Sequence, residues 1–197
     1  MFKWKNLKEV DKVQVGFYFD QTRCIGCSAC AVACKDWHDV PAGPIQFMRI
    51  LYDERGKFPN VYVSYQINPC FHCEDPVCIP VCPVNAITKR EEDGIVIVDS
   101  DKCIGNEECD SKCLKACPYD SPQFGQEVGA KMRKCNYCLD RHLKGKVPAC
   151  IETCRTRALE TDTLEELETK YGKIKEADNF TYSERTKPAI VFKPKEK

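Results

Sequence analysis

Two short runs of apolar residues predict β-strands at corresponding places in two parts of the chain. Val13 to Phe19 and Ile95 to Val98 are rich in β-branched and aromatic residues, which is the composition that strands favour. Each run stands before a similar sequence, Asp-Gln-Thr-Arg-Cys-Ile-Gly at residues 20–26 and Asp-Ser-Asp-Lys-Cys-Ile-Gly at residues 99–105. This repetition indicates a duplicated unit.

The segment from Thr161 to Gly172 has the pattern of a capped amphipathic helix. Leu164, Leu167 and Tyr171 recur at the spacing of one helix face, and a glycine stands where the helix should end,. We expect this helix to be structural, and we expect Phe180 to Val191 to run extended over the rest of the protein or over a partner.

Composition and charge exclude several classes of protein. Lys and Arg together number 30, as do Asp and Glu, so no strongly basic surface favours nucleic acid. The longest apolar runs fall far short of the roughly 18 residues that span a bilayer. Residues 1–10 contain neither an apolar signal core nor a twin arginine, so we expect no export signal in the chain itself.

The cysteines carry the strongest chemical signal. There are sixteen in 197 residues, and they form four groups of four. The first has the C-x2-C-x2-C-x3-C spacing that wraps three thiolates around one iron-sulphur cluster and directs the fourth to another. The second has two extra residues before its third cysteine and ends in Cys-Pro; the fourth has an eleven-residue loop in its middle. The groups are Cys24, Cys27, Cys30 and Cys34; Cys70, Cys73, Cys78 and Cys82; Cys103, Cys109, Cys113 and Cys117; Cys135, Cys138, Cys150 and Cys154.

Disulfides and zinc are the alternative uses of so many thiols. Disulfides need an oxidising compartment, which the expected lack of an export signal disfavours. A structural zinc-binding protein is the sharper alternative, because paired C-x2-C sequences also make four-thiolate zinc sites. Zinc-binding cysteines usually come as separated pairs, whereas groups one and two each place three cysteines in one short loop. The spacing therefore favours iron-sulphur clusters, and zinc without iron or acid-labile sulphide in the purified protein would contradict them.

These motifs resemble bacterial-type ferredoxins and, more closely, the four-cluster electron-transfer subunits of the DMSO reductase family of molybdenum or tungsten enzymes. The resemblance covers roughly residues 13–195. The best local matches to the DMSO, polysulphide and thiosulphate reductase subunits are Cys34-Lys-Asp36, Cys73-Glu-Asp-Pro76, Cys117-Pro-Tyr119, Cys138-Leu-Asp-Arg141 and Lys187-Pro-Ala-Ile190.

The resemblance implies an α+β fold of two ferredoxin-like modules, the second inserted into the first, each holding two clusters. The outer module would comprise residues 1–66 and 126–197, with cysteine groups one and four, the C-terminal helix and the extended tail. The inserted module would comprise residues 67–125, with groups two and three.

On that pattern, the rule that a fourth cysteine serves the partner cluster implies the ligand sets. All sixteen cysteines are then iron ligands. The expected sets are Cys24, Cys27, Cys30 and Cys154 for cluster 1; Cys34, Cys135, Cys138 and Cys150 for cluster 2; Cys70, Cys73, Cys78 and Cys117 for cluster 3; Cys82, Cys103, Cys109 and Cys113 for cluster 4.

The third group departs from this pattern at Asn106, which stands where the first repeat has Cys27. If Asn106 replaces a ligand, the site would hold a three-iron (3Fe-4S) cluster, as in some family members, and one thiol would be idle. If the loop is longer instead, Cys109 becomes the second ligand and every cysteine is used. We favour the insertion and four 4Fe-4S clusters, because Cys117 fits the expected closing cysteine.

The sequence contains no nucleophile with an adjacent base and no glycine-rich phosphate loop, so we expect no catalytic residues. The three histidines are dispersed at positions 38, 72 and 142. Six cations lie near the fourth group, and they either form a solvated loop or raise a cluster potential or contact a partner. These six are Lys131, Arg133, Lys134, Arg141, Lys144 and Lys146.

We therefore expect a non-catalytic electron-transfer subunit. It would relay single electrons through four clusters between a large molybdenum or tungsten bis-pterin (molybdopterin-type) catalytic subunit and a membrane anchor or soluble redox partner. The equivalent subunit of a hydrogenase or formate dehydrogenase complex is the alternative within this class. We expect no membrane insertion of its own and a cytoplasmic or partner-dependent membrane location, with export only beside a signal-bearing partner.

Overall fold

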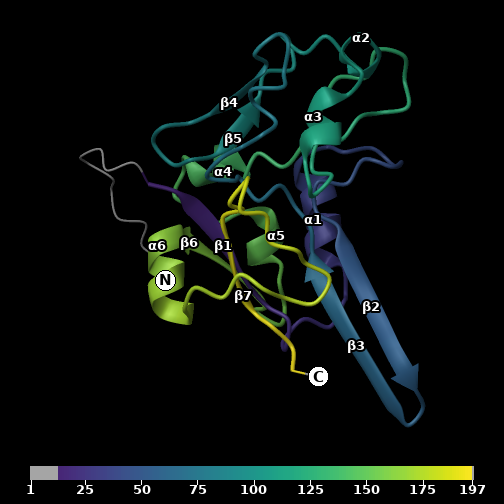
Figure 1. The fold of residues 1–197 in the computed structure, drawn as a ribbon, viewed down its shortest axis with the longest axis vertical. Helices are drawn as coiled ribbons and strands as arrows, with labels where there is room; N and C mark the ends of the chain where they lie inside the picture. Colours follow the sequence, from purple (N-terminus) through teal and green to yellow (C-terminus); the bar gives the residue numbers. More distant parts are fainter. Residues whose placement is uncertain (1–12, 197) are drawn as a thin grey trace.

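The computed structural model describes residues 13–196, so the expectation about an export signal at residues 1–10 lies outside the described residues. The described chain mixes short helices and strands, as the sequence predicted (Figure 1). The elements in chain order are β1 (Val15–Asp20), α1 (Ala29–Trp37), β2 (Ile50–Lys57), β3 (Asn60–Ile67), β4 (Ile87–Lys89), β5 (Val96–Val98), α2 (Asn106–Cys109), α3 (Lys112–Ala116), α4 (Leu139–His142), α5 (Ala149–Glu152), β6 (Leu159–Thr163), α6 (Leu164–Tyr171) and β7 (Ile190–Lys193).

A three-stranded sheet joins the beginning of the described chain to its end. Strand β1 lies in the middle, antiparallel to β6 and parallel to β7. All six residues of β1 are buried, which explains why this strand is a nearly continuous apolar run rather than an alternating one. The predicted strand from Val13 to Phe19 is thus present, shifted slightly toward the C-terminus.

Helix α6 covers one face of this sheet (Figure 1). Its first turn is capped by the Thr163 hydroxyl, which accepts a hydrogen bond from the Glu166 amide at 3.2 Å, and it ends at Gly172, whose φ is 83°. Leu167 packs against Tyr18 and Val191 of the sheet. The helix is shorter than predicted, because residues 161–163 complete strand β6.

The predicted extended segment from Phe180 to Val191 is a strand only at its end, where β7 begins at Ile190. A turn interrupts it, since the amides of Thr186 and Lys187 both donate to the Ser183 carbonyl, at 3.1 and 2.8 Å.

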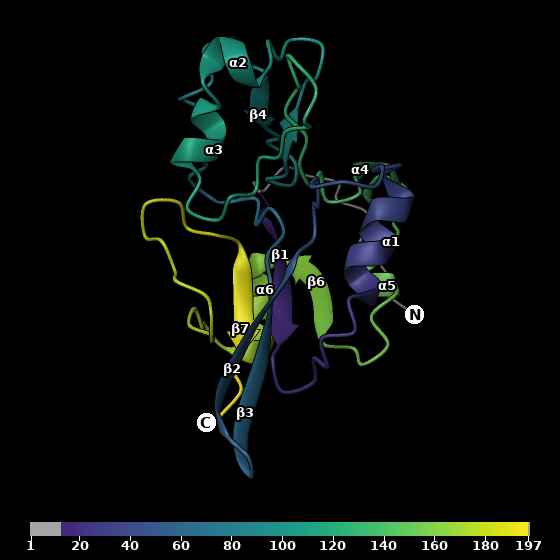
Figure 2. The ribbon, with the colours of Figure 1, turned by 90° about the vertical axis from the view of Figure 1, so that its right-hand side faces the viewer.

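The short hairpin of β4 and β5 lies away from the three-stranded sheet, beside α2 and α3 (Figure 2). Its own small core contains Ile87, Val96, Cys113 and Met132. The predicted strand from Ile95 to Val98 is therefore present as β5.

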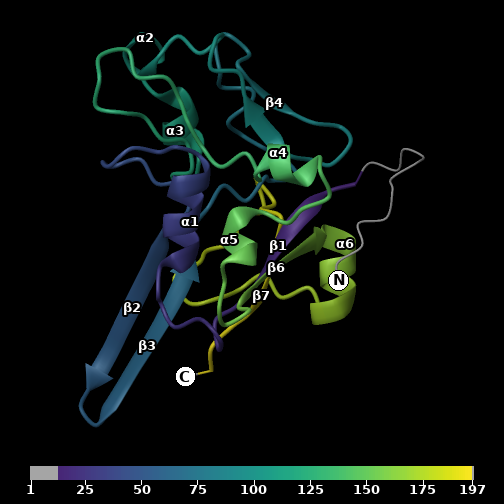
Figure 3. The ribbon, with the colours of Figure 1, turned by 180° about the vertical axis from the view of Figure 1, so that it is seen from behind.

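A second hairpin, β2 and β3, projects from the body of the molecule (Figure 3). Its tip carries Phe58, which is 93% exposed. Within residues 13–196, no helix combines the length and apolar character needed to cross a bilayer.

Replacement of Leu167 by alanine tests the packing of α6. The side chain is 2% exposed, and truncating such a leucine costs about 2–5 kcal/mol. We expect Leu167→Ala to lower the midpoint of guanidinium denaturation followed by circular dichroism. Leu143→Ala is the matched control, because Leu143 is 66% exposed and surface changes cost about 0.5 kcal/mol or less. Equal midpoints for the two variants would contradict this account of the sheet.

Candidate iron-sulphur sites

The sixteen cysteines are all free thiols, and they gather at four places. Site 1 is a cavity lined by Cys24, Cys27, Cys30 and Cys154 together with apolar side chains such as Phe19 and Leu159. The first three follow β1 in a tight loop that leads into α1, and Cys154 comes from the segment after α5. Helix α1 packs against α5, and this contact brings together thiols that are far apart in the sequence.

The loop of site 1 depends on a glycine. Gly26 has φ of 66°, in the left-handed region that side chains disfavour. A Cβ at this position would also overlap the ring of Tyr65 on β3. The Cys-Ile-Gly-Cys sequence therefore has its glycine where the chain turns tightly against a neighbouring strand.

Site 2 brings Cys34 beside Cys135, Cys138 and Cys150, all of them buried. Burial, followed by the nearby Cys138 and Cys30, raises the pKa of the Cys34 thiol to about 12. Burial likewise raises the pKa of Cys150 well above its usual value, with added contributions from Cys135, Cys34 and Cys138. These four thiols are therefore electrostatic neighbours.

Site 3 is a cavity lined by Cys70, Cys73, Cys78 and Cys117, with Phe71 and Tyr119 among its apolar walls. Phe71 is 1% exposed and meets Tyr119 edge to face, with 5.0 Å between the ring centroids. These aromatic side chains pack beside the cysteines, as the residue types around the motif suggest.

Site 4 is a cavity lined by Cys82, Cys103, Cys109 and Cys113, with Ile87, Val98 and Met132. Asn106 is not part of this lining: it begins α2, and its amide donates to the Ala130 carbonyl at 3.0 Å. Gly105 permits the turn, because its φ is 93° and a Cβ there would lie 2.6 Å from the Gly129 carbonyl oxygen. The longer loop thus carries Cys109 to the cavity and leaves Asn106 outside it.

The donor set and the shape of these places fit a thiolate-bound cluster. Three cavities enclose about 350, 390 and 350 Å³, part of it open to solvent, and each has four thiols and mostly apolar walls. A single zinc ion would need four sulphurs at about 2.3 Å from one point. In the part of the chain that the structure describes, no group of three or more His, Cys, Asp or Glu side chains is arranged to hold one metal ion.

Burial disfavours the thiolate form of several of these cysteines. It raises the pKa of Cys30 and of Cys73 to about 12, and that of Cys113 to about 11. Because the thiolate is the form that binds metal, cluster assembly must release protons from these sites.

Interactions between cysteines show which sites are neighbours. Cys30 of site 1 and Cys34 of site 2 lie one turn apart on α1. The pKa of Cys135 in site 2 is raised by burial, then by Cys34 and by Cys70 of site 3. That of Cys78 in site 3 is raised to about 12 by burial, then by Cys70, and more weakly by Cys113 of site 4. Site 1 therefore neighbours site 2, site 2 neighbours site 3, and site 3 neighbours site 4; we call this succession of neighbours the row of sites.

Several polar donors reach the sulphurs, and the sequence alone did not identify them. The Met132 amide donates to Cys103 Sγ at 3.4 Å, and the Ala86 amide donates to Cys82 Sγ at 3.3 Å. His38 Nε2 lies 3.4 Å from Cys138 Sγ. His72 is fully buried, and its Nδ1 accepts a hydrogen bond from the Val96 amide at 3.0 Å; burial lowers its pKa well below the usual value, so it is neutral.

The six cations near the fourth group separate into distinct environments. Lys131, Lys144 and Lys146 are exposed and Arg133 is half-buried. Arg141 is buried, forms an ion pair with Glu152 and lies over the Trp37 ring at 4.5 Å. Lys134 is buried among the cysteines.

Comparison with known proteins agrees with this chemistry. Two families described as 4Fe-4S dicluster domains match residues 61–164 and 23–86. The probable anaerobic dimethyl sulfoxide reductase subunit YnfG of Escherichia coli is 43% identical over 92% of this chain and 89% of its own length. The B subunit of the anaerobic dimethyl sulfoxide reductase of E. coli is 42% identical over the same shares. The protein NrfC of E. coli is 33% identical over 94% of this chain and 80% of its own length.

Replacement of Gly26 by alanine tests the loop of site 1. We expect Gly26→Ala to lower the iron content of the purified protein, because the new Cβ overlaps the Tyr65 ring in a backbone conformation that alanine disfavours,. Gly145→Ala is the matched control: its φ of 69° is similar, but no atom lies within 4 Å of the added Cβ. An equal effect of both variants on iron content would show that the contact with Tyr65 is unimportant.

Proposed function

The chain belongs to the family of iron-sulphur electron-transfer subunits of DMSO reductase-type enzymes, and on this basis we propose that it relays single electrons through four 4Fe-4S clusters. The observation that carries this proposal is the convergence of sixteen cysteines at four places, four at each. The ligand sets proposed are those that share a site: Cys24, Cys27, Cys30 and Cys154; Cys34, Cys135, Cys138 and Cys150; Cys70, Cys73, Cys78 and Cys117; Cys82, Cys103, Cys109 and Cys113.

A full 4Fe-4S cluster at site 4 is part of the proposal. It is supported by the place of Cys109 in the cavity lining and by the position of Asn106 at the other end of α2, outside that lining. With Cys109 as a ligand, the site has four thiols and no cysteine is left over. The 3Fe-4S alternative would leave Cys109 without a role.

The residues of the chain would hold each cluster in place, surround it with apolar side chains and set which clusters are neighbours. Each bound cluster would supply one-electron chemistry, taking up an electron from one neighbour and releasing it to the next. The mostly apolar walls limit the access of water to the sulphurs, and the local polarity around such centres tunes their potential. The row from site 1 to site 4 gives an electron a continuous route.

We propose that the chain forms the two modules that the family resemblance implies. Residues 1–66 and 126–197 would form the outer module, and residues 67–125 the inserted one. Support comes from the pairing of β1 with β6 and β7, which closes the outer part across the insertion, and from the local β4–β5 hairpin within the inserted part.

The proposed partners are a large molybdenum or tungsten bis-pterin catalytic subunit and a membrane anchor or another redox protein. The relatives support the first, because two of them are named as parts of a dimethyl sulfoxide reductase. They also favour a reductase of this type over a hydrogenase or formate dehydrogenase. The subunit would act in anaerobic respiration, at a membrane only through its partners, and would be exported only beside a partner that carries a signal.

Co-purification tests the partner. We expect a tagged chain, isolated without oxygen from its native cells, to bring down a large subunit that contains molybdenum or tungsten and a pterin. Reduced methyl viologen, a one-electron donor, should then reduce the catalytic metal faster in the complex than in the separated large subunit. Recovery of a nickel-containing large subunit would instead support the hydrogenase alternative.

Substitutions at Cys109 and Asn106 test site 4. We expect Cys109→Ser to remove or alter one of the four clusters, because it deletes a ligand, and Asn106→Ala to keep all four. Iron and sulphide analysis and electron paramagnetic resonance (EPR) of the oxidised and reduced protein would measure both. A three-iron signal in the oxidised, unsubstituted protein, unchanged in Cys109→Ser, would contradict the assignment.

A further inference from the structure

Lys134 differs from the other cations near the fourth cysteine group because its charge lies inside the protein. The residue is 4% exposed. Its Nζ donates to Cys70 Sγ at 3.6 Å, to the Cys135 carbonyl at 2.9 Å and to the Val96 carbonyl. An ammonium group has three N–H bonds and no lone pair. Three acceptors around Nζ therefore match the protonated, positively charged form.

No carboxylate balances this charge. Within residues 13–196, no Asp or Glu forms an ion pair with Lys134, whereas the buried Arg141 has Glu152 as its partner. The three groups that Lys134 contacts are two backbone carbonyl oxygens and the sulphur of Cys70. A buried cation of this kind is costly unless an anion lies nearby. Lys134 also lines the cavity of site 3, so a cluster bound there through Cys70 would place its negative charge beside Nζ.

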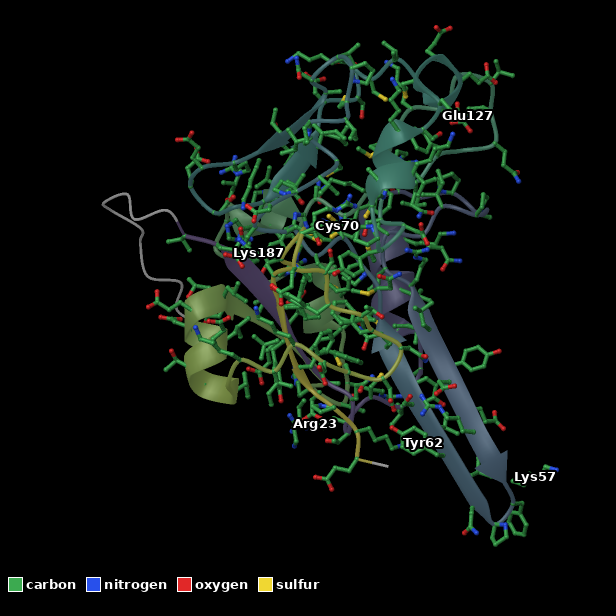
Figure 4. The ribbon with its side chains drawn as sticks, viewed as in Figure 1. Arg23, Lys57, Tyr62, Cys70, Glu127 and Lys187 are labelled. Atoms are coloured by element: carbon green, nitrogen blue, oxygen red, sulfur yellow. The ribbon has the colours of Figure 1, made fainter. Side chains whose placement is uncertain are left out.

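The position of Lys134 is at the junction of two sites and of the two proposed modules. Cys70 belongs to site 3, Cys135 belongs to site 2, and each contacts Lys134 directly. Figure 4 shows Cys70 in the middle of the molecule, between the half that contains β4 and β5 and the half that contains β1. Both backbone polar groups of Val96 on β5 are hydrogen-bonded, since its amide donates to His72 and its carbonyl accepts from Lys134.

We propose that Lys134 is the fixed positive charge that raises the reduction potential of the cluster at site 3 and, to a smaller degree, that of the cluster at site 2. The inference rests on the proposed function, since it needs clusters bound at these sites. Each reduction adds a negative charge, and a cation held within hydrogen-bond distance of a ligand sulphur stabilises the reduced form in a medium where solvent screens little.

Potentiometric EPR of the four-cluster protein tests this role with Lys134→Met, which keeps the length of the side chain and removes the charge. We expect the reduction equilibrium of the cluster at site 3 to become about tenfold less favourable, which lowers its midpoint potential by about 59 mV. The potential at site 2 should fall by less, and those at sites 1 and 4 should not change. Lys131→Met is the matched control, because Lys131 lies three residues away and is exposed. Unchanged potentials in Lys134→Met, or equal shifts in both variants, would overturn the proposal.

A measurement on the unsubstituted protein covers the case in which Lys134→Met does not assemble. Protein labelled with ¹⁵N only in lysine should show, by pulsed EPR of the reduced clusters, a hyperfine coupling from one lysine nitrogen. Its absence would overturn the proposal. If the protein holds four clusters but shows neither the shift in potential nor the lysine coupling, this inference is wrong and the proposed function stands. If the purified protein lacks iron and sulphide, both are wrong.

Discussion

Thiols from distant parts of the chain must meet at four points, and the rest of the structure depends on this constraint. Each site takes three cysteines from one group and the fourth from another, as Cys154 joins the loop that begins at Cys24. The conformations of the connecting segments are therefore coupled, because a shift of one segment would remove a thiol from a second site. Bound clusters would replace much of the apolar contact that holds an ordinary core together.

The elements around the sites are correspondingly small. Helices α2, α4 and α5 have four residues each, which is too short to be stable alone in water. Cysteines of the sites lie within two of them, as Cys109 does in α2 and Cys150 in α5, and α5 also packs against α1 and β6. The β6–β1–β7 sheet forms a conventional apolar core, with Phe17, Phe19 and Phe192 almost completely buried. This core joins the two ends of the described chain, so it supports the arrangement of a module interrupted by another.

Features that depend on the local spacing of residues could be predicted from the sequence, whereas features that depend on tertiary contacts could not. The strands before the two cysteine loops and the helix ending at Gly172 follow from short-range pattern, and all are present. The β2–β3 hairpin was not predicted, although Val61, Val63 and Ile67 alternate with polar residues on β3. Half of the sixteen residues in its two strands are exposed, six of them on β2, so the alternating apolar pattern is confined to one strand. The contact between His38 and Cys138 could not be predicted, because 100 residues separate them in the sequence.

The same limit explains why six cations near one cysteine group could not be ranked from the sequence. Lys131 and Lys134 are three residues apart, yet solvent screens one charge and the protein encloses the other. A charge at the surface contributes little to the energy of a buried electron, since water reduces its field many times over. The enclosed charge of Lys134 lies where the row of sites passes from site 2 to site 3. In the proposed relay, an electron that passes between the two modules would cross this point, so the charge of Lys134 would act on that transfer step.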